Sequence, residues 1–397
     1  MKQLLNNIYG DKAMWALVVL LAIFSFLPVY SASSNLVYVV GNGSVVGHII
    51  KHIVIVVVGM TIMFGIHRMP FRYFKGLSIM LLPVVVLLLL YTALQGSTIG
   101  GANASRWIRI PLMGITFQPS TLAMVVLMVY ISGYLSKKRE QIIRFGESIL
   151  PLWLPVFLIV GLVLPSNFST AAMMFLMVLV LAFLGGYPLK YLAGILVAGM
   201  VGLALFVLVA KAYPEAMPNR VDTWMSRLDS FYNGGTSDSD YQIERAKTAI
   251  VSGGLVGVGA GKSVMKNLLP QSTSDFIYAI IAEEYGLLGA LSLLFFYLLL
   301  LFRIVVIAHK AETPFGKLLV MGVGLPIIFQ ALVNMAVAVE LFPVTGQPLP
   351  LISSGGTSIW MTFLALGIVL SVSANRNPKP IMNDENDNPL AILSETL

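Results

Sequence analysis

The 397-residue sequence has no cysteine, only four histidines and few charged side chains. Without cysteine, the chain can form no disulfide and offers no thiolate nucleophile or cysteine-ligated metal. With so few histidines as well, we predict no transition-metal site. Charged residues make up 11% of the chain and hydrophobic residues 57%, a balance that a soluble domain could not bury. We therefore predict that a lipid bilayer surrounds most of the chain.

Hydrophobic runs of about 20 residues, the length that crosses a bilayer, recur along the sequence. They predict an all-α polytopic membrane protein with about ten transmembrane helices and no second folded domain. The predicted spans are 13–31, 48–66, 76–94, 117–135, 148–164, 168–184, 189–210, 276–302, 315–341 and 349–371.

Lysine and arginine are concentrated in alternate short loops, at 67–75, 136–147 and 303–317. This bias predicts that both termini are cytoplasmic, and it also explains the net charge of +7 without a nucleic-acid partner. It places the loops 96–116 and 211–274 on the outer face. The second of these, between spans seven and eight, is long enough to be functional or partly structured.

The chain becomes polar after residue 374, with the segment NRNPKPIMNDENDN. We predict a membrane domain over 1–374 and a disordered cytoplasmic tail over 375–397.

The long outer loop runs into SDFIYAIIAEEYG, where Asp275 opens a predicted span and Glu283 and Glu284 follow about two turns deeper. A carboxylate at the end of a membrane span is costly unless it pairs, titrates or takes part in chemistry. Asp275 could simply cap the helix that follows it. The basic loop before it favours a second reading, in which Asp275 is a general base beside an anionic lipid substrate.

The loop supplies cations that could hold the phosphate of such a substrate, with Arg220 and Arg227 best suited to bidentate contacts and Lys266 as a third candidate. The alternative for each of them is that it only anchors the loop to lipid headgroups. The segment GGLVGVGAGKS, 253–263, is not a phosphate loop, because that pattern requires glycine where Val256 stands. Its glycines favour tight turns or close helix approach. The weaker alternative is a backbone nest that binds a pyrophosphate.

Two further polar segments enter predicted spans. PVTGQPLPLISSGGTS, 343–358, has three prolines and three glycines, which favour a broken or re-entrant backbone. We predict that it forms a cavity wall with Ser353, Gly355 and Gly356, and that Asn334 and Glu340 face the same interior. In SRWIRIPLMGITFQPS, 105–120, Arg106 suits an interface, while Gln118 and Ser120 are expected to turn toward the bundle interior.

These motifs together resemble the SEDS family (shape, elongation, division and sporulation), whose members include FtsW and RodA. The matching segments follow one order along the chain: ASRWIRI, FQPS, DYQIERAKTAIVSGGLVGVGAGKS, LPQSTSDFIYAIIAEEYGLLG and PVTGQPLPLISSGGTS. The resemblance covers nearly all of the chain up to Asn375, and we lean to the division branch on general similarity.

The resemblance implies a peptidoglycan glycosyltransferase that polymerises lipid II on the outer face of the bacterial inner membrane. Asp275 stands at the position of the family's proposed catalytic residue, as the general base that deprotonates the acceptor sugar 4-hydroxyl, with undecaprenyl pyrophosphate leaving. Arg106, Gln118, Ser120, Arg220, Arg227, Lys266, Glu283, Glu284, Ser353, Gly355 and Gly356 are the expected substrate-binding residues. A divalent cation (Mg or Mn), a class B penicillin-binding protein and other division membrane proteins are implied as cofactor and partners.

The sequence departs from the family pattern in two places. The family usually reads QPSE-x-x-K where this chain has Thr121 and Met124, so a Glu and a Lys are both missing. Loss of both members of an ion pair costs less than loss of one. The family also carries P-D-x-G-T near Asn167, where this chain has no acidic residue.

Two functions of other classes fit the same sequence. A lipid II flippase would also need many spans, intramembrane carboxylates and a cation-lined cavity. A non-catalytic scaffold of the division machinery is the third possibility. No inverted repeat supports the flippase, and the acidic motif lies at one membrane face.

Overall fold

The computed structural model describes residues 9–38, 44–94, 98–99, 102–103, 106–110, 115–139, 143–213, 221–233, 238–269 and 272–374. Helices dominate these residues, which confirms the predicted all-α class. The helices are α2 (Lys12–Phe24), α3 (Phe26–Tyr38), α4 (Val45–Ile66), α5 (Arg72–Leu94), α6 (Pro119–Lys138), α7 (Phe145–Ser148), α8 (Leu154–Val163), α9 (Phe168–Leu184), α10 (Leu189–Ala212), α11 (Val221–Asn233), α12 (Asp238–Gly253), α13 (Ile277–Lys310), α14 (Pro314–Ala338) and α15 (Gly356–Ala374).

Short elements complete the described chain, and the strands among them were not predicted. Two antiparallel strand pairs precede α6: β1 (Thr98–Ile99) pairs with β2 (Ala102–Asn103), and β3 (Ile108–Ile110) pairs with β4 (Ile115–Phe117). The other short elements are a π-helical turn (Ile149–Trp153) and a 3-10 turn (Met265–Asn267).

Within the described residues, nine helical stretches are long and apolar enough to cross a membrane. The first joins α2 and α3 across Ser25, and α9, with 17 residues, is shorter than the others. The predicted number of about ten spans therefore depends on α9. The last predicted span was too long at its start, since 349–355 is irregular and the helix begins at Gly356.

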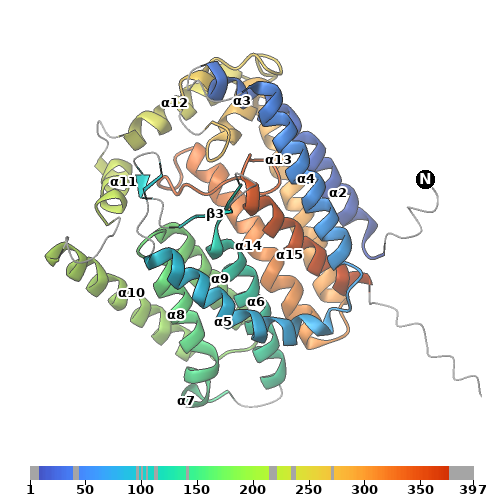
Figure 1. The fold of residues 1–397 in the computed structure, drawn as a ribbon, viewed down its shortest axis with the longest axis vertical. Coiled ribbons are helices and arrows are strands. Elements are labelled where there is room, and N and C mark those ends of the chain that lie inside the picture. The colour runs from blue at the N-terminus through green and yellow to red at the C-terminus, as the bar shows by residue number, and fades with distance from the viewer. Residues whose placement is uncertain are drawn as a thin grey trace, which may run out of the picture.

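The helices run side by side, and their burial separates a central group from a peripheral one (Figure 1). Inside the protein, 72% of the apolar span is buried for α6 and α15 and 67% for α14, against 11% for α10. Because α10 is apolar all round yet hardly covered, its surface suits lipid contact. The central helices are those that surround the site described below.

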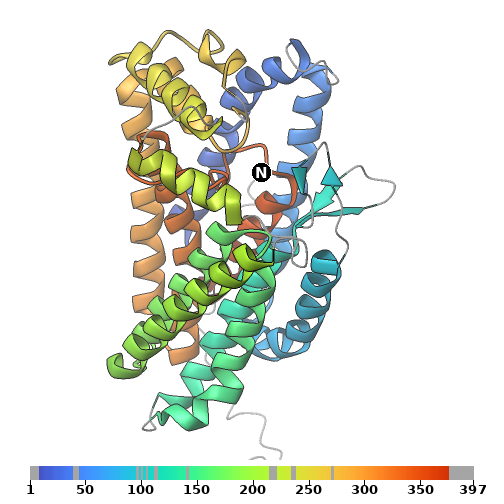
Figure 2. The same cartoon turned by 90° about the vertical axis from the view of Figure 1, so that its left-hand side faces the viewer.

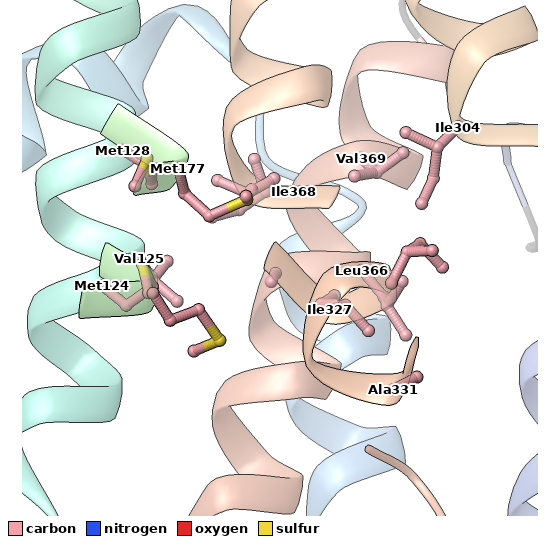
Figure 3. Packing of buried hydrophobic residues seen from close by; sticks show 14 of the residues in the cluster. Met124, Val125, Met128, Met177, Ile304, Ile327, Ala331, Leu366, Ile368 and Val369 are labelled. Atoms are coloured by element: carbon pink, nitrogen blue, oxygen red, sulfur yellow. The ribbon is translucent and has the colours of Figure 1, made fainter. Parts of the chain in front are cut away.

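Figure 3 shows how α6, α9, α13, α14 and α15 meet in the core. Met177 extends toward the branched side chain of Ile368, and Ile327 lies beside Leu366. Unbranched methionines fill irregular gaps between helices, so this packing joins helices that are far apart in sequence.

The described part of the long loop 211–274, which was predicted to be functional or partly structured, is largely helical. It contains α11 and α12, and α12 packs against α13. Figure 2 shows α12 at one end of the bundle and α7 at the opposite end. Arg220 and the tail 375–397 lie outside the described residues.

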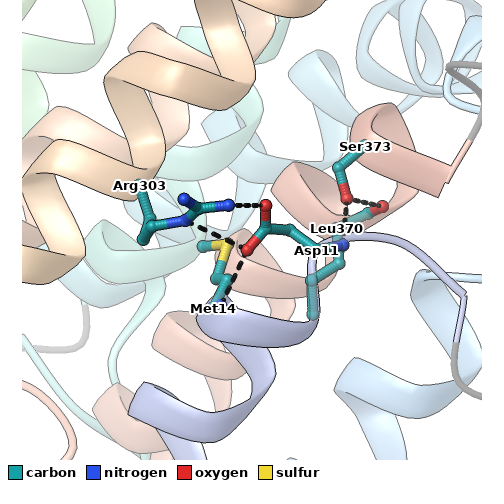
Figure 4. A network of polar contacts seen from close by, with 5 residues as sticks. All are labelled: Asp11, Met14, Arg303, Leu370 and Ser373. Carbon is teal, nitrogen blue, oxygen red and sulfur yellow. Dashed lines mark hydrogen bonds and ion pairs between the residues drawn. The ribbon is translucent and has the colours of Figure 1, made fainter.

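Asp11 connects three helices through a partly buried ion pair and a backbone hydrogen bond (Figure 4). The Asp11 carboxylate caps α2 by accepting from the Met14 amide at 2.9 Å, and it also pairs with the Arg303 guanidinium of α13. The Asp11 amide donates to the Ser373 hydroxyl of α15 at 2.8 Å. The single carboxylate therefore serves both as a helix cap and as an ion-pair partner.

We expect Asp11→Ala to lower the free energy of unfolding by about 3 kcal/mol, because it removes a cap and leaves Arg303 without its charge partner. Chemical unfolding in detergent micelles measures the change. Glu147→Gln is the matched control, since the Lys138–Glu147 pair is exposed and such pairs contribute little. Equal stability of the Asp11 and Glu147 variants would contradict this account.

Candidate active site

Asp275 lies immediately before α13, and its backbone is fastened to the end of α14. The Asn334 side-chain amide donates to the Asp275 carbonyl at 2.7 Å. The Ser353 hydroxyl donates to the Ser274 carbonyl at 2.6 Å, and the Ser354 amide donates to the Thr273 carbonyl at 3.0 Å. These bonds fix where the Asp275 carboxyl group can point.

The segment 343–355 that provides these contacts is irregular, as the prolines and glycines predicted. Its buried backbone is satisfied by side chains, as membrane depth requires. Gln330 donates to the Pro348 carbonyl at 2.7 Å, Asn334 to the Gln347 carbonyl at 2.8 Å, and the Leu349 amide to the Ser353 hydroxyl at 2.8 Å. The uncharged amides of α14 therefore hold both this segment and the start of α13.

A cavity of about 310 Å³ opens beside Asp275. Its lining follows α6 from Gln118 to Met128, which extends about 15 Å into the bundle. The lining is polar around Asp275 and mostly apolar farther in. The polar lining residues near Asp275 are Arg106, Trp107, Gln118, Ser120, Asn167, Thr170, Ser274, Gln347 and Ser354.

Two arginines approach the Asp275 carboxylate from different elements. A Cβ atom placed on Gly346 would lie 3.5 Å from Asp275 Oδ2 and 3.9 Å from Arg227 Nη1, so these groups flank the same glycine. Arg227 of α11 also donates to the Val344 carbonyl at 3.1 Å. Arg106 lies between the two strand pairs and lines the cavity.

Burial controls the charge of Asp275. Loss of hydration raises the pKa of its carboxyl group above the usual range, because the charged form is the one that burial disfavours. The charge of Arg106, a hydrogen bond from Ser274 and the charge of Arg227 oppose this effect and lower the pKa. Burial is the largest of these effects, so the carboxyl group takes up a proton more readily than an exposed aspartate.

Several sequence-predicted residues come together in this cavity. Asp275, Arg106, Gln118, Ser120 and Gly355 all line it. Ser353 supports the backbone beside it, and Gly356 begins α15 next to Gly355.

Lys266, Glu283 and Glu284 do not line this cavity and form a separate cluster. Ser263 donates its hydroxyl proton to Glu283 and its amide to Glu284, and Ser31 of α3 donates to Glu284. The Lys266 ammonium donates to the Gly261 carbonyl at 2.6 Å. They were predicted to lie with Asp275 because they are close to it in the sequence. The sequence did not show that Glu283 and Glu284 point from α13 toward Ser263 of the loop.

Glu340 also departs from its predicted place. It was expected in the interior with Asn334, but it pairs with Lys247 on the surface. Glu340 has a positive φ of 60° at the end of α14, where the helix has ended and the side chain is free to turn outward.

Sequence reasoning missed the amides that shape the site. Gln330 and Gln347 line the cavity, and the Gln347 side chain donates to the Thr170 hydroxyl at 2.8 Å. For Gln330 the available signal was an uncharged amide within an apolar span, whereas Gln347 lies in the irregular segment 343–355.

A second cavity of about 420 Å³ lies next to the first and is almost entirely apolar. Met173 and Gln347 line both cavities, and Arg227 lines the second. The second cavity lies between α9, α10, α11 and α14. Its apolar lining includes Phe168, Ala172, Leu176, Leu203, Val207, Trp224, Leu228, Phe329 and Val333.

Comparison with known proteins identifies the family. The model of the cell cycle protein family that covers FtsW, RodA and SpoVE matches residues 11–378. The chain belongs to this family. A protein of Trichlorobacter lovleyi named "Probable peptidoglycan glycosyltransferase FtsW" is 30% identical over 380 residues, which cover 94% of this chain and 95% of that protein.

Two solved structures share the fold of this FtsW/RodA/SpoVE family member. A chain from a peptidoglycan synthase complex, described as coordinating polymerization and crosslinking, has a TM-score of 0.71, 27% identity, and coverage of 93% of this chain and 99% of that chain. The rod shape determining protein RodA of Thermus thermophilus has a TM-score of 0.65 and 27% identity, and the match covers 92% of this chain and 97% of that one. The predicted family is confirmed.

The departures from the family pattern fall within the first cavity. Thr121 and Met124, where the pattern has Glu and Lys, both line it, and so does Asn167. The cavity of this family member therefore carries neutral side chains at these three positions.

The described residues form no cage for a metal ion, since they bring no three His, Asp or Glu residues together. His48 and His52 are four residues apart on α4, but no third ligand of these types joins them. Among the described residues that line the first cavity, Asp275 is the single carboxylate. One carboxylate fits a Mg²⁺ ion that substrate phosphates hold for the most part.

Arg106→Met should raise the pKa of Asp275 further, since it removes a positive charge that stabilises the carboxylate. Arg227→Met should raise it by a smaller amount. The infrared carboxyl band that disappears in Asp275→Asn reports the titration. Lys266→Met is the control and should leave the band's midpoint in place, whereas an unchanged or lower midpoint in Arg106→Met would refute the assignment.

Proposed function

We propose that this chain is a peptidoglycan glycosyltransferase that polymerises lipid II on the outer face of the inner membrane during cell division. The observation that carries the proposal is the Asp275 carboxyl group, partly buried in a cavity with Arg106 beside it and Arg227 adjacent. The names of the relatives support the reaction class, and the position of Asp275 in the cavity supports its role as the catalytic residue.

The reaction needs a base and a site for a leaving diphosphate. Asp275 removes the proton from the 4-hydroxyl of the acceptor sugar, and the freed oxygen attacks the anomeric carbon of the growing strand. The bond from that carbon to the phosphate oxygen breaks, and undecaprenyl pyrophosphate leaves. A carboxyl group with a raised pKa is a stronger base than an exposed one. Arg106 and Arg227 stabilise the negative charge that develops on the diphosphate.

The second cavity supplies a place for the lipid chain. It is apolar, and Arg227 lines it beside Gly346, the glycine that Asp275 also approaches. A polyprenyl chain in this cavity would bring its attached phosphate to Arg227 and its sugar toward Asp275. Burial of an isoprenoid chain stabilises binding in proportion to the apolar area covered.

A divalent cation, if bound, would lie on the diphosphate with Asp275 as the carboxylate available to it. It would supply positive charge to the leaving group. The roles of Asp275 and the two arginines do not depend on it.

We propose a class B penicillin-binding protein as partner, together with other division membrane proteins. The similarity to a chain of a peptidoglycan synthase complex supports this partner. The alternating lysine and arginine content of the loops supports cytoplasmic termini and an outer-face position for the cavity end of the bundle.

Asp275→Asn should abolish glycan synthesis from purified lipid II by the protein with its cognate penicillin-binding protein, because the amide cannot accept the hydroxyl proton. The control is Glu340→Gln, which removes a carboxylate outside the cavity and should retain activity. Gel analysis of glycan strands measures both. Full activity of Asp275→Asn would refute the assignment, and lipid flipping without glycan in the wild type would favour a flippase.

Ala172→Phe should raise the KM for lipid II about tenfold, because the new ring fills the second cavity while the chemical groups stay in place. Val201→Phe makes the same kind of change on the exposed surface of α10 and should have no effect. Initial rates at varied lipid II concentration give both constants. An unchanged KM in Ala172→Phe would place the lipid chain elsewhere.

A further inference from the structure

The helix that follows Asp275 is broken nine residues after its start. Gly286 lies in α13 with φ 66° and ψ −169°, values far from helical, so the helix divides into a short segment, 277–285, and a long one, 287–310. A break of this kind leaves carbonyl and amide groups unpaired, which is costly at membrane depth. Something must satisfy these groups.

The outer loop satisfies them by inserting its own backbone. The amides of Val258 and Gly259 donate to the carbonyls of Glu283 and Glu284, both at 3.0 Å. On the other side of the break, the Leu287 amide donates to the Gly254 carbonyl at 2.9 Å. The segment 254–259, called here the glycine insert, therefore bridges the two parts of α13.

The insert fits only because side chains are missing at the contact. A Cβ atom on Gly257 would lie 2.2 Å from the Glu284 carbonyl oxygen, and one on Gly286 would lie 2.5 Å from the Gly257 amide nitrogen. Gly257 also has φ 92°, which other residues adopt at a cost. Close approach explains Gly253 and Gly257, whereas Gly254, Gly259 and Gly261 have positive φ angles that favour glycine.

Glu283 fastens the chain that follows the insert. Its side chain is 1% exposed and accepts from the Val264 amide at 2.9 Å, from the Met265 amide at 3.3 Å and from the Ser263 hydroxyl. Both carboxylate oxygens are used within the protein, which leaves Glu283 little capacity to bind substrate. The loop is thus bound to α13 twice, through its backbone at the break and through this carboxylate.

We propose that Glu283 is a positioning residue for Asp275 and acts through the glycine insert. The short segment 277–285 begins two residues after Asp275, so the angle at the break determines where Asp275 lies relative to Arg106 and Arg227. Asn334 and Ser353 hold the other end of this segment. Glu283 and the insert fix the direction from which the carboxylate enters the cavity. The expected change in kcat rests on the proposed function, whereas the expected change in the position of residue 275 does not.

Two variants disturb the device independently. Glu283→Ala removes the carboxylate, and Gly257→Ala places a methyl group against the Glu284 carbonyl without changing any charge. Both should lower kcat about 100-fold with little change in KM, because misplacement of a catalytic group by about 1 Å has an effect of that size. Glu283→Gln keeps an acceptor for the two amides and should restore most of the activity. Ser263→Ala removes the hydroxyl that donates to Glu283 and accepts from the Lys266 amide, but keeps the two amide bonds to Glu283, so its activity should fall between.

A second readout does not depend on activity. The chain has no cysteine, so Asp275→Cys introduces a single thiol whose reaction rate with a maleimide reports access to position 275. The rate should rise when Glu283→Ala or Gly257→Ala is added. Ser31→Ala, which removes the Ser31 hydroxyl bond to Glu284 and spares the insert, is the control and should leave it unchanged.

The outcomes separate the two proposals. Equal labelling rates in the wild-type, Glu283→Ala and Gly257→Ala backgrounds would overturn the positioning role, whatever the activity. A raised KM with unchanged kcat in Glu283→Ala would also overturn it, by making Glu283 a substrate contact. Absence of glycan from the wild type would refute the proposed function, and the labelling rates would still decide the positioning role.

Discussion

The structure depends on one constraint, which is that a carboxylate must be held partly buried at the end of a membrane helix. Asp275 loses hydration there, and this raises the pKa of its carboxyl group. The positive charges of Arg106 and Arg227, which come from separate segments, partly offset this rise in pKa. The opposing effects leave a group that can hold or release a proton beside positive charge, which is what proton abstraction near a diphosphate requires.

The position of Asp275 depends on two places where regular helix is interrupted. One is the irregular segment 343–355 before α15, and the other is the break at Gly286 in α13. In each, backbone groups at membrane depth are paired inside the protein, by the amides of α14 in the first case and by the glycine insert in the second. In the central helices α6, α14 and α15, by contrast, the helical backbone is unbroken.

Much of this could be predicted from sequence, because the strongest signals are local. Apolar runs predicted the helices, and the prolines and glycines of 343–358 predicted the irregular backbone. The family motif indicated Asp275 as the candidate catalytic residue. The separation of Glu283 from Asp275 could not be predicted, since it depends on which face of α13 the loop packs against. Glu340 was misplaced because α14 ends before it and its positive φ lets the side chain turn outward. Gln330 and Gln347 carried no charge to mark them. The strand pairs beside Arg106 were too short for a periodic pattern.

The most direct test of the account is a structure of the protein with undecaprenyl pyrophosphate bound. We expect the diphosphate next to Arg227 and Arg106, with the polyprenyl chain in the apolar cavity between α9, α10, α11 and α14. Asp275 should then face the position of the transferred sugar. A diphosphate bound instead at Lys266, near Glu283 and Glu284, would contradict the central claim that the Asp275 cavity is the active site.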